Sequence, residues 1–207
     1  MAIAMLITGA VAYVVGNNNA MLSVIFGSPL KWVVMFAPLA VVFGLSATIN
    51  KLSAGAAQLL FWAFSALVGL SISYIFAVYT GMSISQTFLV TAIAFSGLSI
   101  WGYTTKKDIS AWGSFLMMGV IGLIVASIIN IFMASAAMQF AVSSIGVLIF
   151  AGLTAYDTQR IKNDYIQMSR SGNTDWLAKS AIMGALSLYL NFLNMFMFLL
   201  SFMGNRN

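Results

Sequence analysis

The stretch GLTAYDTQRIKN, residues 152–163, contains the most unusual carboxylate of the chain, Asp157. The 207 residues include four acidic side chains and neither histidine nor cysteine, which excludes histidine acid–base catalysis, disulfides and thiolate metal sites. The other three acids stand in polar surroundings, whereas Asp157 follows the apolar run SSIGVLIFAGLTAY. Ionisable groups in such runs are costly and usually mark ion or proton pathways. An interfacial carboxylate paired with Arg160, three residues further on, is the other interpretation, and the spacing leaves both open.

Three polar side chains at helical spacing are the expected companions of Asp157. They lie in GALSLYLNFLNMFMFLL, residues 184–200. Asn191 and Asn194 are three residues apart and share a helix face, and Ser187 extends the stripe by one turn. A lone amide in an apolar helix often bonds only a neighbouring helix. A stripe of three opposite a carboxylate favours a polar pathway instead.

Apolar residues dominate the elements that must position these groups. Hydrophobic residues make up 61% of the chain and charged residues 6%, with a mean hydropathy of +0.99. A soluble domain carries roughly 25% charged residues, so the composition indicates an integral membrane protein. The apolar runs are continuous rather than alternating, which favours helices over a β-barrel.

Seven apolar segments predict an all-α protein with seven transmembrane helices in a single domain, residues 1–207. A helix that crosses the hydrocarbon core needs about 20 residues. The first segment offers only about 14 residues, or about 21 Å of helix, so we expect a first helix that is shortened at its N-terminus. The predicted segments are 2–15, 31–49, 57–80, 84–103, 114–134, 138–157 and 180–203.

The polar stretch NDYIQMSRSGNTDWLAK, residues 163–179, is predicted to be the one long loop. Ser171 and Gly172 predict a turn in it, and Asp175 is the expected N-cap of the last helix. We interpret Asp164 and Asp175 as solvated loop charges.

Small residues recur at four-residue spacing in two of the segments. Ser65, Gly69 and Ser73 form one such stripe, and Gly122 and Ala126 form another. Stripes of this kind let helices approach closely in lipid, so we expect both to serve helix packing.

Basic residues are distributed unequally between the two predicted sides of the membrane. Seven follow even-numbered segments, against Lys31 and Arg206 on the opposite side. The positive-inside rule makes the richer side cytoplasmic, which predicts a cytoplasmic N-terminus and a C-terminus outside. Orientation and lipid contact then explain the net charge of +5 without a nucleic-acid partner. The seven are Lys51, Lys106, Lys107, Arg160, Lys162, Arg170 and Lys179.

Four motifs together carry a resemblance to a known family. They are KLSAG (51–55), GYTTKKDIS (102–110), GLTAYDTQRIKN and GALSLYLNFLNMF (184–196). The chain resembles the Bax inhibitor-1 family, also called the transmembrane Bax inhibitor motif family, essentially end to end, and is closest to its bacterial members. The resemblance implies a seventh helix at the centre of a shell of six. It also implies a pH-sensitive calcium leak channel, which we expect in the bacterial inner membrane.

The resemblance further implies two carboxylates near the cytoplasmic end of the pore. Asp157 matches the one on the sixth helix. The one on the seventh helix falls in the pattern LYLDF, which here reads LYLNF, so this position is Asn191. Two close carboxylates repel each other and titrate as a unit, whereas an amide can donate a hydrogen bond to the charged carboxylate. We therefore expect a weakened or acid-shifted pH response.

Calcium fits this set as a permeant ion rather than as a resident cofactor. Calcium takes six to eight oxygen ligands, and Asp157, Asn191 and Asn194 supply only a few. Water must supply the rest, so we expect a weak, transient site that permits release, as conduction requires. We expect no cofactor and no enzymatic activity. Lipid and calcium are the expected partners, and the sequence does not identify a protein partner.

Other functions stay open at this stage. A proton-coupled secondary transporter would use Asp157 as its protonatable group, but neither an inverted repeat nor paired broken helices are evident. An intramembrane aspartyl protease needs two carboxylates that share a proton, and no other acid lies in a predicted span. A non-transporting membrane regulator that acts through protein partners also remains open.

Overall fold

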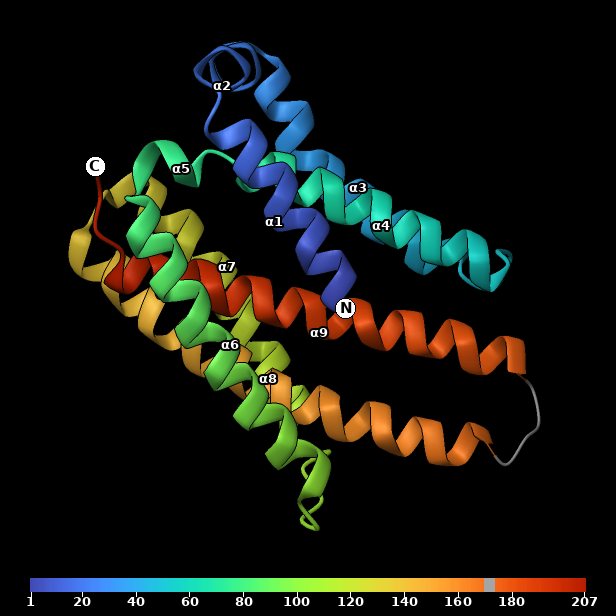
Figure 1. The fold of residues 1–207 in the computed structure, drawn as a ribbon. Coiled ribbons are helices and arrows are strands. Elements are labelled where there is room, and N and C mark those ends of the chain that lie inside the picture. Colours follow the sequence, from blue (N-terminus) through green and yellow to red (C-terminus); the bar gives the residue numbers. More distant parts are fainter. Residues whose placement is uncertain (170–173) are drawn as a thin grey trace. The chain divides into compact units, whose positions relative to one another are not determined.

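The described residues, 1–169 and 174–207 of the computed structural model, fold into helices joined by short connections (Figure 1). Within these residues the extended pairing is limited to an isolated antiparallel bridge between Tyr79 and Arg206. The prediction of an all-α fold is confirmed. The helices are α1 (Ala2–Gly16), α2 (Asn19–Phe26), α3 (Leu30–Thr48), α4 (Ala54–Ile72), α5 (Ile75–Val78), α6 (Gly81–Thr104), α7 (Trp112–Met133), α8 (Ala136–Ser169) and α9 (Thr174–Met203).

Within residues 1–169 and 174–207, six helices are long and apolar enough to cross a membrane, if α4 and α5 are counted together as Ala54–Val78. The others are α3, α6, α7, α8 and α9. Helices α1 and α2 pass the same test only as a pair, which is bent by 97°, so the number of spans is six, or seven if this pair is one span. The chain is therefore a multi-span integral membrane protein.

Helix α8 is much longer than its apolar segment. It has 34 residues, or about 51 Å at 1.5 Å per residue, and it continues to Ser169, while α9 begins at Thr174. The prediction of a long loop over residues 163–179 is therefore wrong. The polar residues that follow the apolar run contain neither glycine nor proline up to Ser169, so nothing local ends the helix there. Arg170 and the predicted turn at Ser171 and Gly172 lie outside the described residues.

The two acids assigned to that loop lie on helices instead. Asp164 is a half-buried residue of α8. Asp175 lies inside the first turn of α9, so its prediction as the N-cap is wrong. Its Oδ2 atom pairs with Nζ of Lys179, one turn further on, at 2.8 Å.

Backbone contacts divide the described chain into two units, which we treat separately. The first unit comprises Met1–Gly81, Gln167–Tyr189 and Arg206–Asn207, and the second comprises Met82–Ile166 and Leu190–Asn205. Helix α9 contributes a long stretch to each unit, and its buried share, 44%, is the largest among the six candidate spans. The central place of the last helix in a shell of six stays a prediction. The single domain over residues 1–207 stays a prediction.

In the first unit, α4 packs against α1 and α3. A Cβ atom at Gly69 would lie 2.7 Å from the carbonyl oxygen of Thr8, so α1 and α4 meet where glycine leaves room. The Thr8 hydroxyl also donates a hydrogen bond to the carbonyl oxygen of Ser65 at 2.8 Å. The packing role predicted for the stripe is thus confirmed at Ser65 and Gly69. In the other predicted stripe, the packing role is wrong at Gly122, where a Cβ atom would meet nothing within 4 Å.

A buried tyrosine joins the middle of α9 to this packing. Tyr189 is fully buried, and its hydroxyl lies 2.7 Å from Oγ1 of Thr8. The rings of Phe61 and Phe64 on α4 meet the Tyr189 ring edge-on, at centroid distances of 5.7 and 5.6 Å. The contact therefore holds α1, α4 and α9 together at one point.

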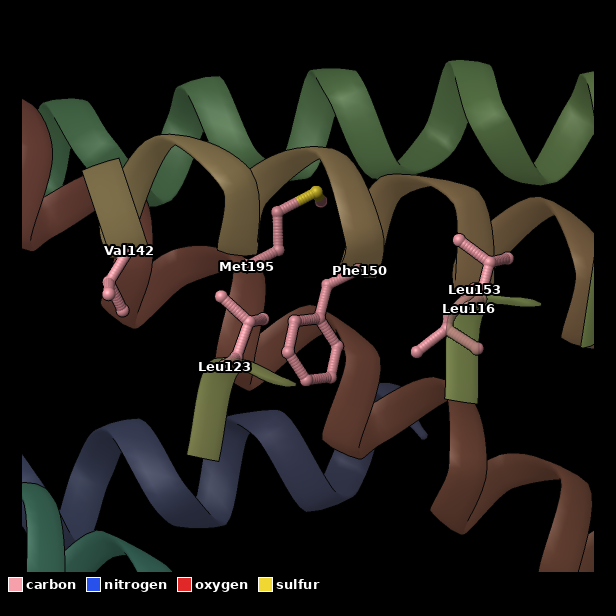
Figure 2. Close-up of a cluster of buried hydrophobic side chains, with 6 residues drawn as sticks. All are labelled: Leu116, Leu123, Val142, Phe150, Leu153 and Met195. Carbon is pink, nitrogen blue, oxygen red and sulfur yellow. The ribbon is translucent and has the colours of Figure 1, made fainter. Parts of the chain in front are cut away.

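In the second unit, an apolar cluster fixes the end of α9 against α7 and α8 (Figure 2). Phe150 of α8 and Met195 of α9 belong to this cluster and are buried. The cluster lies on the segments that carry the candidate site, so it sets the relative position of α8 and the end of α9. Its six buried members are Leu116, Leu123, Val142, Phe150, Leu153 and Met195.

Candidate functional site

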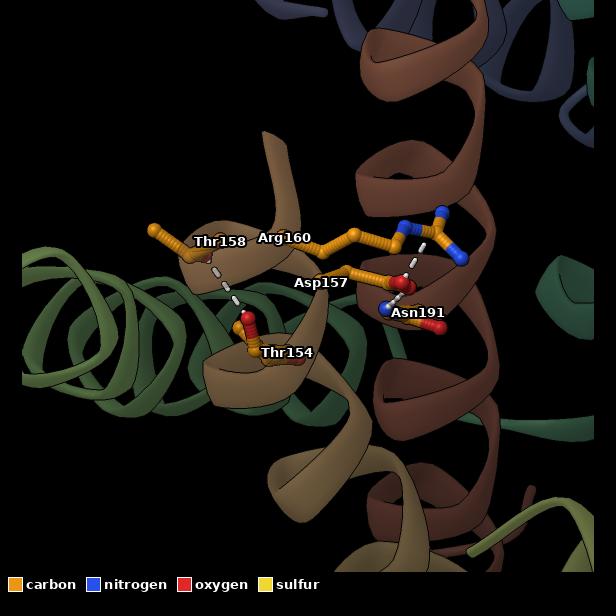
Figure 3. A network of polar contacts seen from close by, with 5 residues as sticks. All are labelled: Thr154, Asp157, Thr158, Arg160 and Asn191. Atoms are coloured by element: carbon orange, nitrogen blue, oxygen red, sulfur yellow. Dashed lines mark hydrogen bonds and ion pairs between the residues drawn. The ribbon is translucent and has the colours of Figure 1, made fainter. Parts of the chain in front are cut away.

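Asp157 on α8 is buried and held by two donors, as Figure 3 shows. Its Oδ2 atom accepts a hydrogen bond from Nδ2 of Asn191 on α9 at 2.7 Å, and Nη2 of Arg160 lies 3.1 Å from its Oδ1 atom. Asp157 is 7% exposed and Asn191 is 5% exposed, but 45% of the Arg160 side chain is exposed. Because both partners donate, the arrangement suits the charged form of the carboxylate.

The two interpretations that the sequence left open for Asp157 each describe part of this site. The ion pair with Arg160, three residues further along α8, is present. The carboxylate is nevertheless buried and contacts an amide on another helix. The site therefore has one buried side, at Asn191, and one more exposed side, at the Arg160 guanidinium.

The backbone of α8 just before Asp157 is packed tightly against its neighbours. A Cβ atom at Gly102 of α6 would collide with the carbonyl oxygen of Ala155, and one at Gly113 of α7 would collide with the Tyr156 ring. Both neighbouring helices thus use glycine to reach this turn of α8. Such close approach restricts rotation of the turn and so fixes the direction of the Asp157 side chain.

Two further polar side chains of α8 form hydrogen bonds that connect the segment after Asp157 to the end of α6 and to the residues that follow it. Gln159 is buried, accepts a hydrogen bond from the Ile109 backbone nitrogen at 3.0 Å and donates one to the Lys107 carbonyl oxygen at 2.8 Å. Lys162 donates from Nζ to the Tyr103 carbonyl oxygen at 2.7 Å, so it satisfies a carbonyl in the last turn of α6. The sequence reasoning missed Gln159, although its amide stands two residues from Asp157. It treated Lys162 only as a topology signal.

The other predicted pore residues are placed differently. Asn194 donates from Nδ2 to the carbonyl oxygen of Leu190 on its own helix at 2.8 Å. It also lines an otherwise mostly apolar cavity of about 410 Å³, together with Val120, Leu123, Ile124, Ser127, Ile128, Ile131, Phe150 and Phe198. Ser187 is half-buried and belongs to the first unit, so its place beside Asp157 stays a prediction. Of the predicted set, the structure brings together Asp157, Arg160 and Asn191.

The oxygen atoms of this site limit how it could hold a metal ion. Asp157 offers two carboxylate oxygens and Asn191 one amide oxygen, fewer than the six to eight that calcium takes. Over the part of the chain that the structure describes, no group of three or more acidic, histidine or cysteine side chains is arranged to hold a metal ion. A calcium ion at Asp157 would therefore keep most of its water.

Comparisons with known proteins cover the whole chain. The sequence profile of the family described as Inhibitor of apoptosis-promoting Bax1 matches residues 1–207. An uncharacterized protein of Caulobacter vibrioides is 46% identical over 98% of this chain and 84% of its own length. Inner membrane protein YbhL of Escherichia coli (strain K12) is also 46% identical, over 100% of this chain and 88% of its own length. An uncharacterized protein of Borreliella burgdorferi is 39% identical, over 100% of this chain and 88% of its own length.

Proposed function

The chain belongs to the Bax inhibitor-1 family, and on this premise we propose that it is a pH-sensitive calcium leak channel with Asp157 at the cytoplasmic end of its pore. The name of the Escherichia coli relative supports a location in the bacterial inner membrane. The excess of basic residues after even-numbered segments supports a cytoplasmic N-terminus and a C-terminus outside. No enzymatic activity is part of the proposal.

The observation that carries this proposal is the buried contact between Asp157 and Asn191. A carboxylate inside a membrane protein usually marks an ion path, and this one has a half-exposed partner in Arg160. When the guanidinium moves away from Oδ1, a cation can take its place without any change in α8. The few protein oxygens hold a calcium ion weakly, so the ion leaves again, as a leak requires.

In this proposal Asn191 sets the pH response. A pair of carboxylates at this distance would repel and bind protons as a coupled unit. The amide does not titrate between pH 6 and 8 and donates to the carboxylate instead. Only Asp157 can then gain a proton at this contact, so the response is weaker or shifted toward acid.

Calcium influx into vesicles tests the proposal. The purified protein is reconstituted in vesicles loaded with a calcium dye, and influx is measured between pH 6 and 8. Asp157→Asn should reduce influx and flatten its pH dependence, whereas Asn191→Asp should make the pH dependence steeper. Asp175→Asn is the matched control, because it removes an exposed acid that pairs with Lys179.

Three results would count against the proposal. Unchanged influx and pH dependence in Asp157→Asn would remove the pore role of Asp157. Saturating influx with exchange against an internal ion would indicate a secondary transporter. A complete lack of influx in folded parent protein would favour a membrane regulator that acts through partners.

A further inference from the structure

The connection between α6 and α7, residues 105–111, presents two lysines on a backbone that is held in place. We refer to these residues as the α6–α7 loop. Lys106 and Lys107 are exposed, and among the described residues neither forms an ion pair. Gln159 bonds the loop at the Lys107 carbonyl and at the Ile109 nitrogen, so the backbone under the lysines is already ordered.

The acid of the loop and the neighbouring base of α8 make contacts other than ion pairs with these two lysines. Asp108 is the loop's single acid, and its Oδ1 atom accepts a hydrogen bond from the Ser110 backbone nitrogen at 2.9 Å. Lys162 of α8 donates to the Tyr103 carbonyl oxygen and lies 5.1 Å from the centre of the Tyr103 ring. Two ammonium groups thus remain available to an external anion.

The helix ends on either side of the loop present an amphipathic surface. The rings of Trp101, at the end of α6, and Trp112, at the start of α7, lie 6.1 Å apart and are both exposed. Tryptophan is enriched at the level of lipid headgroups. Beyond these rings, large apolar side chains are exposed on both helices, among them Ile93 and Ile100 of α6 and Phe115 and Met118 of α7.

We propose that the α6–α7 loop and these helix ends bind an anionic phospholipid, with its headgroup at Lys106 and Lys107 and its acyl chains on the exposed faces of α6 and α7. A soluble anion would contact the lysines but neither the tryptophan rings nor the apolar faces. A phospholipid contacts all three, through its headgroup, its interfacial region and its acyl chains. The loop needs no ordering on binding, which favours affinity. The inference goes beyond the proposed function, because lipid binding here does not require conduction.

Quenching of tryptophan fluorescence by brominated lipids tests this surface directly. Of the five tryptophans, Trp32, Trp62 and Trp176 are replaced with phenylalanine, so that only Trp101 and Trp112 report. Brominated phosphatidylglycerol is compared with brominated phosphatidylcholine at equal mole fractions. A lysine near an anionic lipid surface contributes roughly fivefold in affinity, so for two lysines we expect phosphatidylglycerol to be preferred over phosphatidylcholine by about 25-fold.

Variants of the lysines separate the lipid site from general membrane contact. Lys106→Gln with Lys107→Gln should bring the preference close to one, and replacement of both lysines with arginine should retain it. Lys31→Gln is the matched control, because it removes a lysine of the first unit, outside the α6–α7 loop. Equal quenching by both lipids in the parent, or an undiminished preference in the double glutamine variant, would overturn the proposal. So would relief of the preferential quenching by inorganic phosphate at constant ionic strength.

Discussion

The two partners of Asp157 differ in burial, and this difference predicts which of them matters more for folding stability. Asn191 is 5% exposed and donates at 2.7 Å, whereas the Arg160 side chain is 45% exposed and lies at 3.1 Å. A hydrogen bond to a charged group contributes about 1.5–3 kcal/mol, and removal of a buried donor leaves its acceptor unsatisfied. The ion pair has one buried partner, but solvent screens it on the Arg160 side, so it contributes about 0–1 kcal/mol. We therefore expect Asn191→Leu to lower the free energy of unfolding by about 1.5–3 kcal/mol and Arg160→Gln by less than about 1 kcal/mol.

Thermal unfolding in detergent, followed by tryptophan fluorescence, measures this difference. For a chain of this length, 1 kcal/mol corresponds to about 2–4 °C in Tm. Asn191→Leu should thus lower Tm by about 3–12 °C, and Arg160→Gln by less than about 4 °C. Asn194→Leu is the matched control, because the amide of Asn194 donates within its own helix. Its effect should be small.

A double variant shows whether the loss comes from the Asp157 contact itself. When Asp157→Leu is combined with Asn191→Leu, no buried carboxylate is left without its amide donor, so part of the lost stability should return. If the double variant is less stable than Asn191→Leu alone, or if Arg160→Gln costs more than Asn191→Leu, the buried amide is not the principal partner of Asp157.

Two further predictions concern other parts of the chain. The Thr8 hydroxyl lies 2.8 and 3.0 Å from two carbonyl oxygens, so it keeps an acceptor in Tyr189→Phe, which should lower the free energy of unfolding by about 1 kcal/mol. Thr8→Val deprives the Tyr189 hydroxyl of this partner and should lower the free energy of unfolding by about 1–3 kcal/mol. Thermal unfolding ranks the two variants, and the opposite order would contradict this reasoning. Hydrogen bonds from the side chain and backbone of Ser110 hold the pKa of Asp108 below its usual value of 3.8. These bonds therefore stabilise the folded loop fully above pH 3.8, and this stabilisation is lost as the pH falls through the lowered pKa. Below pH 4, the Ser110 amide should lose protection from hydrogen exchange in the parent but not in Asp108→Asn, once the rates are corrected for the intrinsic pH dependence of exchange. Equal losses of protection in both proteins would refute the assignment of this effect to Asp108.

Hydropathy predicted most of the fold, because each membrane span must be a long apolar helix. It failed where the helix leaves the apolar region. The continuation of α8 to Ser169 depends on local helix propensity and on the absence of glycine and proline, which hydropathy does not measure. The short helix α2 and the bend of 97° before it were missed, because eight residues are too few to show a pattern.

The candidate site was predicted in part, because helical periodicity placed Asn191 on a polar stripe and the family resemblance paired it with Asp157. Their contact at 2.7 Å agrees with that pairing, while the pore role of both stays a prediction. Periodicity grouped Asn194 with Asn191, but it does not show which neighbour each face meets. The contact of Thr8 with Tyr189 joins residues 181 positions apart, and a single sequence gives no sign of such a pair.

The backbone of α8 at Ala155 lies against Gly102 of α6 with no side chain between them. We therefore expect any tilt of α8 within the second unit to turn about this contact. At 1.5 Å per residue, Asp157 lies about 3 Å along the axis from the pivot, while Ile166 lies about 16 Å away. A tilt that shifts the carboxylate by about 0.5 Å therefore shifts the far end by roughly five times as much. A spectroscopic label near Ile166 can follow movements of the carboxylate that are too small to observe at the carboxylate itself.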